Sequence, residues 1–172
     1  IETFGAFHRD PLYNRLQLRK VDVSAKMEYL LSPDEINKMS VEDINALIAP
    51  HFSFDHYLWQ KDNGIKIRED FRADGLSSVL YKCPHCLKEG DMESSGNTIK
   101  CTSCLKEWSL EEDGSLKAVE GEEYFTSIPS WSRWERREVE KEIDEGRYLV
   151  DVRVKILWRG GPRPSMILET EG

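Results

Sequence analysis

The sequence lacks the features of helical membrane proteins and of the common nucleotide-dependent enzymes. No apolar run approaches the ~20 residues that a membrane-spanning helix needs. The longest candidate, residues 148–158, is interrupted by Asp151, Arg153 and Lys155. No signal peptide, P-loop, dinucleotide-binding glycine motif or G-x-S-x-G motif is present. These absences leave no sequence argument for a membrane-spanning helix, a nucleotide-binding site or a serine hydrolase.

The chain is also short of positive charge. Its 172 residues include 24 Lys and Arg against 32 Asp and Glu, which gives a net charge of −8. Such a chain is a poor general ligand for phosphate backbones, so the composition argues against nucleic-acid binding. The length suits one medium-sized domain, alone or with a small appended module. Because the first residue is Ile1 rather than methionine, we expect a fragment or a processed product of a longer protein.

The first half of the chain is predicted to contain one strand and several short helices. Every second residue over 21–29 is apolar, which is typical of a strand. Ser32 and Ser40 each precede a carboxylate by three residues, the pattern of a capping box at a helix start. A third helix is expected over 54–62, with Ser53 as its cap. Its buried stripe is expected to consist of Phe54, Tyr57 and Leu58.

The second half is predicted to contain short strands, one long helix and a final strand pair. The helix covers 130–145 and carries Trp131 and Trp134, which we expect to contact the alternating strand over 150–158. The shorter strands are expected at 97–100, 107–110, 115–118 and 166–168. The fold class is therefore α+β. We divide it into a strand with short helices (1–80), a cysteine-bearing hairpin module (81–118), and a helix with strands that pack back on the first part (119–172).

All four cysteines lie in two copies of nearly one phrase, CPHCLKE and CTSCLKE. The pattern is C-x2-C, fourteen residues, then C-x2-C, which matches zinc ribbons. A tetrahedral Zn²⁺ takes four such ligands, and four protein ligands leave no open position for catalysis. The sequence therefore predicts one structural zinc ion per chain, inside an inserted zinc-ribbon hairpin. Its ligands are expected to be Cys83, Cys86, Cys101 and Cys104.

Several alternatives remain open for this region. Disulfide or redox use of the cysteines, or binding of iron or another metal, would also suit paired C-x2-C motifs. His85 could replace a thiolate, although a solvent-facing role is favoured. Leu87 and Leu105 stand where many zinc ribbons have glycine, and we expect them to pack beneath the site and fasten the ribbon to its own domain. Residues 82–118 hold five lysines against seven acidic residues, which disfavours nucleic-acid recognition.

One further group could support acid–base chemistry. His51, Asp55 and His56 lie close together in the sequence and could form an unrecognised enzyme site. Both histidines stand beside aromatic residues at a predicted helix boundary, which favours ordinary packing or surface roles.

Four separated phrases together resemble a known family. They are RDPLYNRLQLRKVDVSAKMEYLLSPDEI, YLWQKDNGIKIR, GLSSVLYKCPHC and IPSWSRWERREVEKEI. They are similar to the C-terminal region of bacterial 1-acyl-sn-glycerol-3-phosphate acyltransferase family proteins, over roughly residues 5–156. In those longer proteins an acyltransferase domain precedes a region with this order of strand, helices, zinc-ribbon cysteines, Trp-rich helix and strand.

The resemblance implies an accessory role rather than catalysis. The family's catalytic signature is a His and an Asp separated by four residues, and none of His8, His51, His56 and His85 has an Asp at that spacing. The chain would then be the non-catalytic C-terminal domain of a glycerolipid (lysophosphatidate) acyltransferase. Its implied partner is the upstream acyltransferase domain of the same polypeptide, which acts at the cytoplasmic membrane face, so any membrane association would be peripheral and through the parent. The alternative is a stand-alone zinc-ribbon module that binds protein or, less favoured, nucleic acid.

Overall fold

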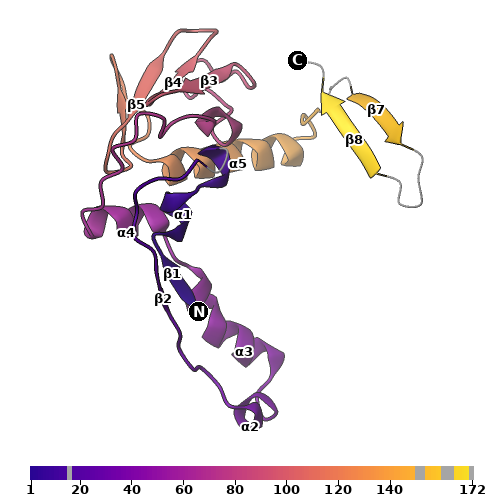
Figure 1. Ribbon diagram of the computed structural model, residues 1–172. Coiled ribbons are helices and arrows are strands. Elements are labelled where there is room, and N and C mark those ends of the chain that lie inside the picture. Colours follow the sequence, from indigo (N-terminus) through magenta and orange to yellow (C-terminus); the bar gives the residue numbers. More distant parts are fainter. Residues whose placement is uncertain (15–16, 150–153, 160–164, 171–172) are drawn as a thin grey trace. The chain divides into compact units, whose positions relative to one another are not determined.

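The computed structural model describes residues 1–14, 17–149, 154–159 and 165–170. Within these residues it combines short helices with three small antiparallel sheets, which confirms the predicted α+β class (Figure 1). Contacts divide the chain into two compact units, Ile1–Glu135 and Arg136–Gly172, which are described separately. The division predicted at residues 80 and 118 stays a prediction.

The first sheet is much smaller than the alternating pattern suggested. β1 (Glu2–Phe4) pairs antiparallel with β2 (Ser24–Lys26), so only three residues of the predicted strand over 21–29 are in a strand. Val23, Met27 and Tyr29 are exposed. Among the described residues, the partner strand is three residues long and the remaining apolar side chains of this segment are not covered. Between the strands lie α1 (Ala6–Arg9) and the short 3-10 helix η1 (Leu12–Asn14).

The next helices begin where the sequence signals indicate. In α2 (Pro33–Ile36), the Ser32 hydroxyl accepts a hydrogen bond from the Glu35 amide while the Ser32 amide donates to the Glu35 carboxylate, which confirms the capping box. Ser40 caps α3 (Val41–Ile48) by accepting from the amide of Asp43, and its hydroxyl donates to the Asp43 carboxylate, so one half of the predicted capping box is present. A 3-10 turn, η2 (Ala49–Phe52), follows directly.

The prediction for the third helix was wrong in two details. α4 (His56–Asp62) is capped by Asp55 rather than Ser53, because the Asp55 carboxylate accepts hydrogen bonds from two amides of the first turn. A carboxylate there also interacts favourably with the helix dipole. Leu58 is 56% exposed, and the buried residue of this helix is Gln60.

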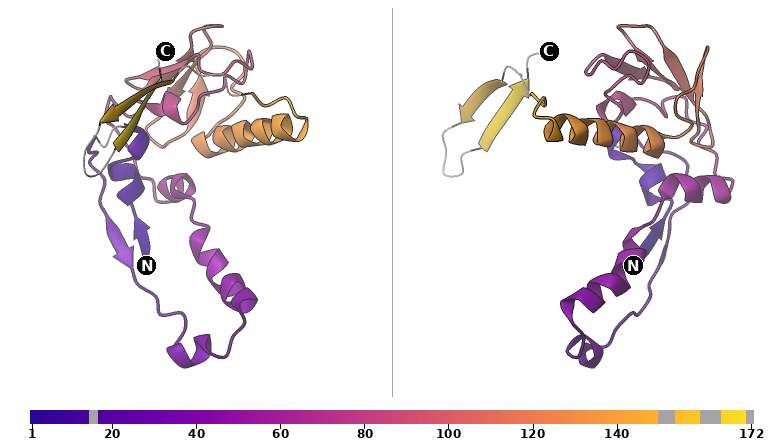
Figure 2. Two further views of the ribbon diagram at one scale, coloured as in Figure 1. Left: turned by 90° about the vertical axis from the view of Figure 1, so that its right-hand side faces the viewer. Right: turned by 180° about the vertical axis from the view of Figure 1, so that it is seen from behind.

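No residue between Asp22 and Trp59 is buried. We call residues 22–55 the arm. It contains β2, α2 and α3, and its exposed apolar side chains include Met27, Tyr29, Val41 and Phe52. In all views α4 lies between α2–α3 and the four-stranded sheet (Figures 1 and 2). The helices of the arm therefore have apolar groups without a core to bury them.

The four-stranded sheet forms the framework of the cysteine module (residues 81–118). It is an antiparallel meander of β3 (Met92–Ser95), β4 (Thr98–Cys101), β5 (Glu107–Leu110) and β6 (Leu116–Ala118), in that order. β3 was not predicted because its sequence, MESS, is mostly polar. It forms as an edge strand, with its first residue, Met92, opposite Cys101.

The core lies where this sheet meets α5 (Ile128–Asp144). Trp108 from β5 and Trp131 from α5 are both fully buried, and their rings meet edge to face at 4.8 Å between centroids. Phe125 stacks on Trp131 and contacts Trp134. The tryptophans of α5 were expected to pack on the strand over 150–158, but they contact the aromatic residues named above. The side chains of that strand lie outside the described part of the structure.

The second unit contains the remainder of α5 and one hairpin. β7 (Val154–Arg159) pairs antiparallel with β8 (Ser165–Thr170) along the full length of both strands. The predicted strands over 150–158 and 166–168 correspond to these elements, although residues 150–153 lie outside the described residues.

Two side chains of α5 hydrogen-bond the backbone of Lys82, the residue before Cys83. Trp131 Nε1 donates to the Lys82 carbonyl at 3.0 Å, and Glu135 Oε1 accepts from the Lys82 amide at 2.8 Å. Glu135 is 2% exposed, and its Oε2 has no hydrogen-bond partner among the described residues. Burial raises the pKa of Glu135 to about 7, against the lowering effect of the Lys82 and Tyr81 amides.

We expect Glu135→Gln to stabilise the protein in a pH-dependent way. Because the carboxyl pKa is higher in the folded state, wild-type stability falls as pH rises from about 4.5 to 7. The glutamine side chain does not ionise, so the variant does not lose stability in this way. Its free energy of unfolding should exceed that of the wild type by close to zero at pH 4.5 and by at most about 3 kcal/mol above pH 7. Urea unfolding across this range measures it. Glu140→Gln, an exposed change on the same helix, should give a flat difference, and a flat difference for Glu135→Gln would contradict the assignment.

Candidate metal centre

The structure brings all four cysteines together. Their Sγ atoms lie within 4.8 Å of one another. Across the site, Cys83 Sγ is 3.7 Å from Cys104 Sγ and Cys86 Sγ is 3.6 Å from Cys101 Sγ. All four are free thiols, since a disulfide would require sulfurs about 2.05 Å apart.

The two cysteine loops have the same backbone hydrogen bonds. In the first loop (83–88), the Cys83 amide donates to the Lys88 carbonyl and the Leu87 amide donates to the Cys83 carbonyl, both at 2.9 Å. In the second loop (101–106), the Cys101 amide donates to the Lys106 carbonyl and the Leu105 amide donates to the Cys101 carbonyl, again at 2.9 Å. The repeated phrase in the sequence thus encodes one loop conformation used twice, which presents each cysteine pair toward the other.

The leucines of the repeated phrase do not pack beneath the site, so that expectation was wrong. Leu87 and Leu105 are 59% and 76% exposed, with φ values of 63° and 64°. Both loops turn through the left-handed region at this position, which costs a residue with a side chain about 1–2 kcal/mol and explains why glycine suits it. The aromatic core around Trp108 and Trp131 fastens the module instead.

Burial and local amides act in opposite directions on the thiols. Burial raises the pKa of Cys83 and Cys101, while backbone amides of the following residues in each loop partly offset this. For Cys86, burial also favours the thiol, but the Lys88 amide and the neighbouring sulfurs hold its pKa below the ordinary value. A cation bound by four thiolates would have to displace the protons that burial favours on Cys83 and Cys101.

The sulfur positions fit a tetrahedral cation. Two ligands about 2.3 Å from a tetrahedral ion are about 3.8 Å apart, close to the 3.6 and 3.7 Å of the cross-site pairs. Thiolates are soft ligands that select zinc, copper(I) or iron–sulfur chemistry over magnesium and calcium. The geometry and the donor set thus make this cluster a candidate metal centre.

No protein-family model, curated protein or solved structure matches the chain. Among the described residues, none of the helices has the length and apolar character needed to cross a bilayer. The function must therefore be argued from the site and from the sequence.

His85 stands apart from the cysteine cluster. It is exposed, and its Nδ1 lies 2.7 Å from the Tyr124 hydroxyl rather than among the sulfurs. This agrees with the favoured prediction of a solvent-facing loop residue. The contact instead joins the first cysteine loop to the segment between β6 and α5.

Each member of the group His51, Asp55 and His56 has a capping, packing or charge contact of its own. Asp55 caps α4, and the His56 ring stacks on Phe7 with centroids 4.9 Å apart. The His56 carbonyl accepts a hydrogen bond from His8 Nε2 at 2.7 Å, and burial lowers the pKa of both histidines. His51 lies 4.0 Å from a Glu2 carboxylate oxygen. These are packing and capping roles, and sequence spacing gave no sign of the His8–His56 contact.

Replacing either leucine of the cysteine loops by glycine should stabilise the protein. Leu87→Gly and Leu105→Gly each remove an exposed side chain from a left-handed position, and we expect a gain of roughly 0.5–1 kcal/mol each in urea unfolding. Val119→Gly is the matched control, because Val119 is 57% exposed but is not in the left-handed region. It should destabilise, and similar losses in all three variants would contradict the strain argument.

Proposed function

We propose that the four cysteines hold one structural Zn²⁺ and that the cysteine module is a zinc ribbon. The observation that supports this is the pair of equivalent loops, which brings the four thiols within 4.8 Å of one another. Zinc suits such a site because it has no geometric preference of its own and no redox chemistry. Four protein ligands complete the coordination, so the ion would hold the fold together rather than activate a substrate.

Each cysteine loop ends in a lysine whose side chain contacts a neighbouring segment. One Zn²⁺ with four thiolates carries a formal charge of −2. Lys88 Nζ donates to the Ser103 hydroxyl of the opposite loop at 3.0 Å, and Lys106 Nζ donates to the Glu120 carbonyl. Both lysines belong to the loops that would carry this charge, and their contacts tie the loops to neighbouring segments.

Protein purified without added metal should contain about one zinc per chain by elemental analysis. Cys83→Ser should lose the metal and unfold the module, because metal binding free energy is folding free energy in such sites. The matched control is Ser103→Ala, which changes the second loop without removing a ligand and should retain zinc. Folded, zinc-free protein would overturn the proposal, and iron in place of zinc, visible as coloured protein, would overturn the assignment of the metal.

We further propose that the chain is the non-catalytic C-terminal accessory domain of a glycerolipid (lysophosphatidate) acyltransferase. Its support is the resemblance of four separated phrases and the absence of a His with an Asp five positions on. The histidines that could have formed another site have packing roles instead. On this proposal any catalytic chemistry belongs to the parent protein, and its location at the cytoplasmic membrane face follows from the parent.

The arm suits a docking role in such a protein. Met27, Tyr29 and Phe52 are each more than three quarters exposed, and an amphipathic helix, α3, has no buried residue. Burial of such apolar surface against a partner contributes favourably to the free energy of binding. The upstream acyltransferase domain is the partner that the resemblance supplies. The same surface would also serve the alternative, a stand-alone protein-interaction module, whereas the seven acidic residues and two lysines of the arm do not favour nucleic acid.

The coding sequence upstream of Ile1 should encode, in frame, a domain with a His and an Asp separated by four residues. In that longer polypeptide, Tyr29→Glu with Val41→Glu should reduce acyl transfer to lysophosphatidate severalfold, because the changes place charge on the docking surface. Val119→Glu, an exposed apolar site outside the arm and the cysteine loops, is the matched control and should leave activity unchanged. An in-frame stop or an unrelated upstream domain would overturn the acyltransferase proposal and leave the interaction module.

A further inference from the structure

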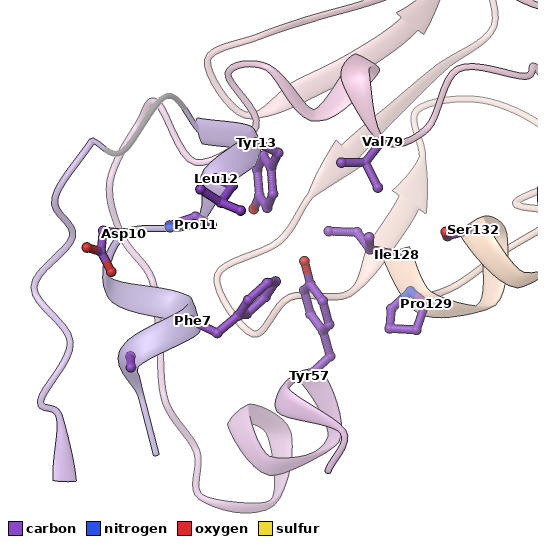
Figure 3. Close-up of a pocket in the computed structure, with 11 residues that line it drawn as sticks. Phe7, Asp10, Pro11, Leu12, Tyr13, Tyr57, Val79, Ile128, Pro129 and Ser132 are labelled. Carbon is purple, nitrogen blue, oxygen red and sulfur yellow. The ribbon is translucent and has the colours of Figure 1, made fainter. Parts of the chain in front are cut away.

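A pocket of about 460 Å³ opens within the first unit, away from the cysteines. Its walls come from the N-terminal segment around α1 and η1, from Tyr57 of α4, from Val79 and from the first turns of α5 (Figure 3). Its volume lies in the range of small-molecule sites. Neither the cysteine cluster nor the arm accounts for it.

The walls are aromatic and aliphatic. The rings of Phe7, Tyr13 and Tyr57 and the side chains of Val79 and Ile128 surround the same space (Figure 3). An aromatic ring between such walls would gain both burial and edge-to-face contacts. The shape and the lining therefore favour a flat apolar group.

The lining excludes an anionic ligand. None of the described residues that line the pocket is Lys, Arg or His. The one charged residue is Asp10, which is exposed and whose carboxylate lies at the outer edge and points away from the pocket (Figure 3). A carboxylate or phosphate placed inside would lose its hydration without gaining a partner, which costs several kcal/mol. An uncharged ligand avoids that cost.

One hydroxyl oxygen of the lining can accept a hydrogen bond from such a ligand and so orient it. The Tyr57 hydroxyl points into the pocket toward Tyr13 (Figure 3). The Tyr13 hydroxyl accepts from Arg19 Nη2 at 2.9 Å and donates to the Arg72 carbonyl at 3.3 Å, so it is already engaged. Burial, and then the charge effect of Tyr13 and a hydrogen bond with it, raise the pKa of Tyr57 well above the ordinary value. The Tyr57 hydroxyl therefore stays protonated with its proton toward Tyr13, and its oxygen is left to accept a hydrogen bond from a ligand. Ser132 on α5 adds a second hydroxyl to the lining.

The walls are held by contacts that do not involve a ligand. The Phe7 ring lies against His56 on one side, and meets Tyr57 edge to face at 5.6 Å. The Arg19 guanidinium lies over the Tyr13 ring at 5.5 Å, and Ile128 belongs to the buried core. A pocket with fixed walls loses little conformational entropy on binding, which favours affinity.

We propose that this pocket binds an uncharged aromatic group with one hydrogen-bonding atom, of the size of a phenol or an indole. The ring would lie among Phe7, Val79 and Ile128, with its polar atom toward the Tyr57 hydroxyl. The source is either a free small molecule or the side chain of a peptide. The proposal is independent of the acyltransferase assignment, because it concerns residues that neither the metal site nor the arm includes.

Binding is tested on the whole chain with p-cresol and indole as probes. Methyl resonances of Val79 and Ile128 should shift saturably, with dissociation constants below about 1 mM. The anionic counterpart 4-hydroxyphenylacetate should bind at least tenfold more weakly than p-cresol. N-acetyltryptophanamide distinguishes the sources: binding tighter than indole assigns the group to a peptide side chain, and weaker binding assigns it to a free molecule. No saturable shift with any uncharged probe, or a preference for the anion, would overturn the proposal.

Two variants locate the probe. Val79→Trp should fill the pocket and abolish binding, whereas Val119→Trp, at an exposed site outside it, should not. Should Val79→Trp fail to fold, Tyr57→Phe keeps the ring and removes only the hydroxyl. It should weaken p-cresol about fivefold, in line with one lost hydrogen bond, and leave toluene unchanged. Equal losses for p-cresol and toluene, in a variant with wild-type circular dichroism, would overturn the role of the hydroxyl, and unchanged binding in Val79→Trp would overturn the site.

Discussion

Two hydrogen bonds to the backbone of Lys82 fix the start of the first cysteine loop to α5. Trp131 and Glu135 of α5 satisfy its carbonyl and its amide inside the core. Either group left buried without a partner would cost about 1–3 kcal/mol, and Cys83, the next residue, would lose its fixed position. The ion pair of the Lys82 side chain with Glu89, at 3.1 Å, ties the end of the first cysteine loop to the same residue. The geometry of the proposed zinc site therefore depends on a helix that is distant in the sequence.

The cysteine loops contain local backbone strain at one position each. Each loop holds a leucine in the left-handed region and exposes it to solvent, although glycine would relieve both disadvantages. The strain persists because the hydrogen bonds of the loops and the sulfur cluster determine the backbone path. Nothing in the structure explains why leucine rather than glycine stands at both positions.

The arm and the aromatic pocket point to interactions beyond the metal. The arm has amphipathic elements without a core, which are the properties of a surface that another chain segment or protein covers. The pocket differs from the arm in two respects. Its wall residues pack against other side chains of the first unit, and its lining has no cationic residue to pair with an anionic ligand. The two features lie in the same unit and suit different kinds of ligand, a protein surface and a small aromatic group.

Local signals in the sequence determined much of the fold and the candidate ligands. The capping serines and the helix α5 depend on contacts within a few residues, so local patterns could predict them. The four cysteines come together across 15 and 21 residues, and they were predicted because two C-x2-C pairs at this spacing are typical of zinc ribbons. The exposure of Leu87 and Leu105, the Trp108–Trp131 contact and the Lys82 hydrogen bonds could not be predicted in this way. They depend on which surfaces meet after the chain folds back on itself. Only the tertiary structure decided that the aromatic core, rather than the repeated leucines, holds the cysteine module in place.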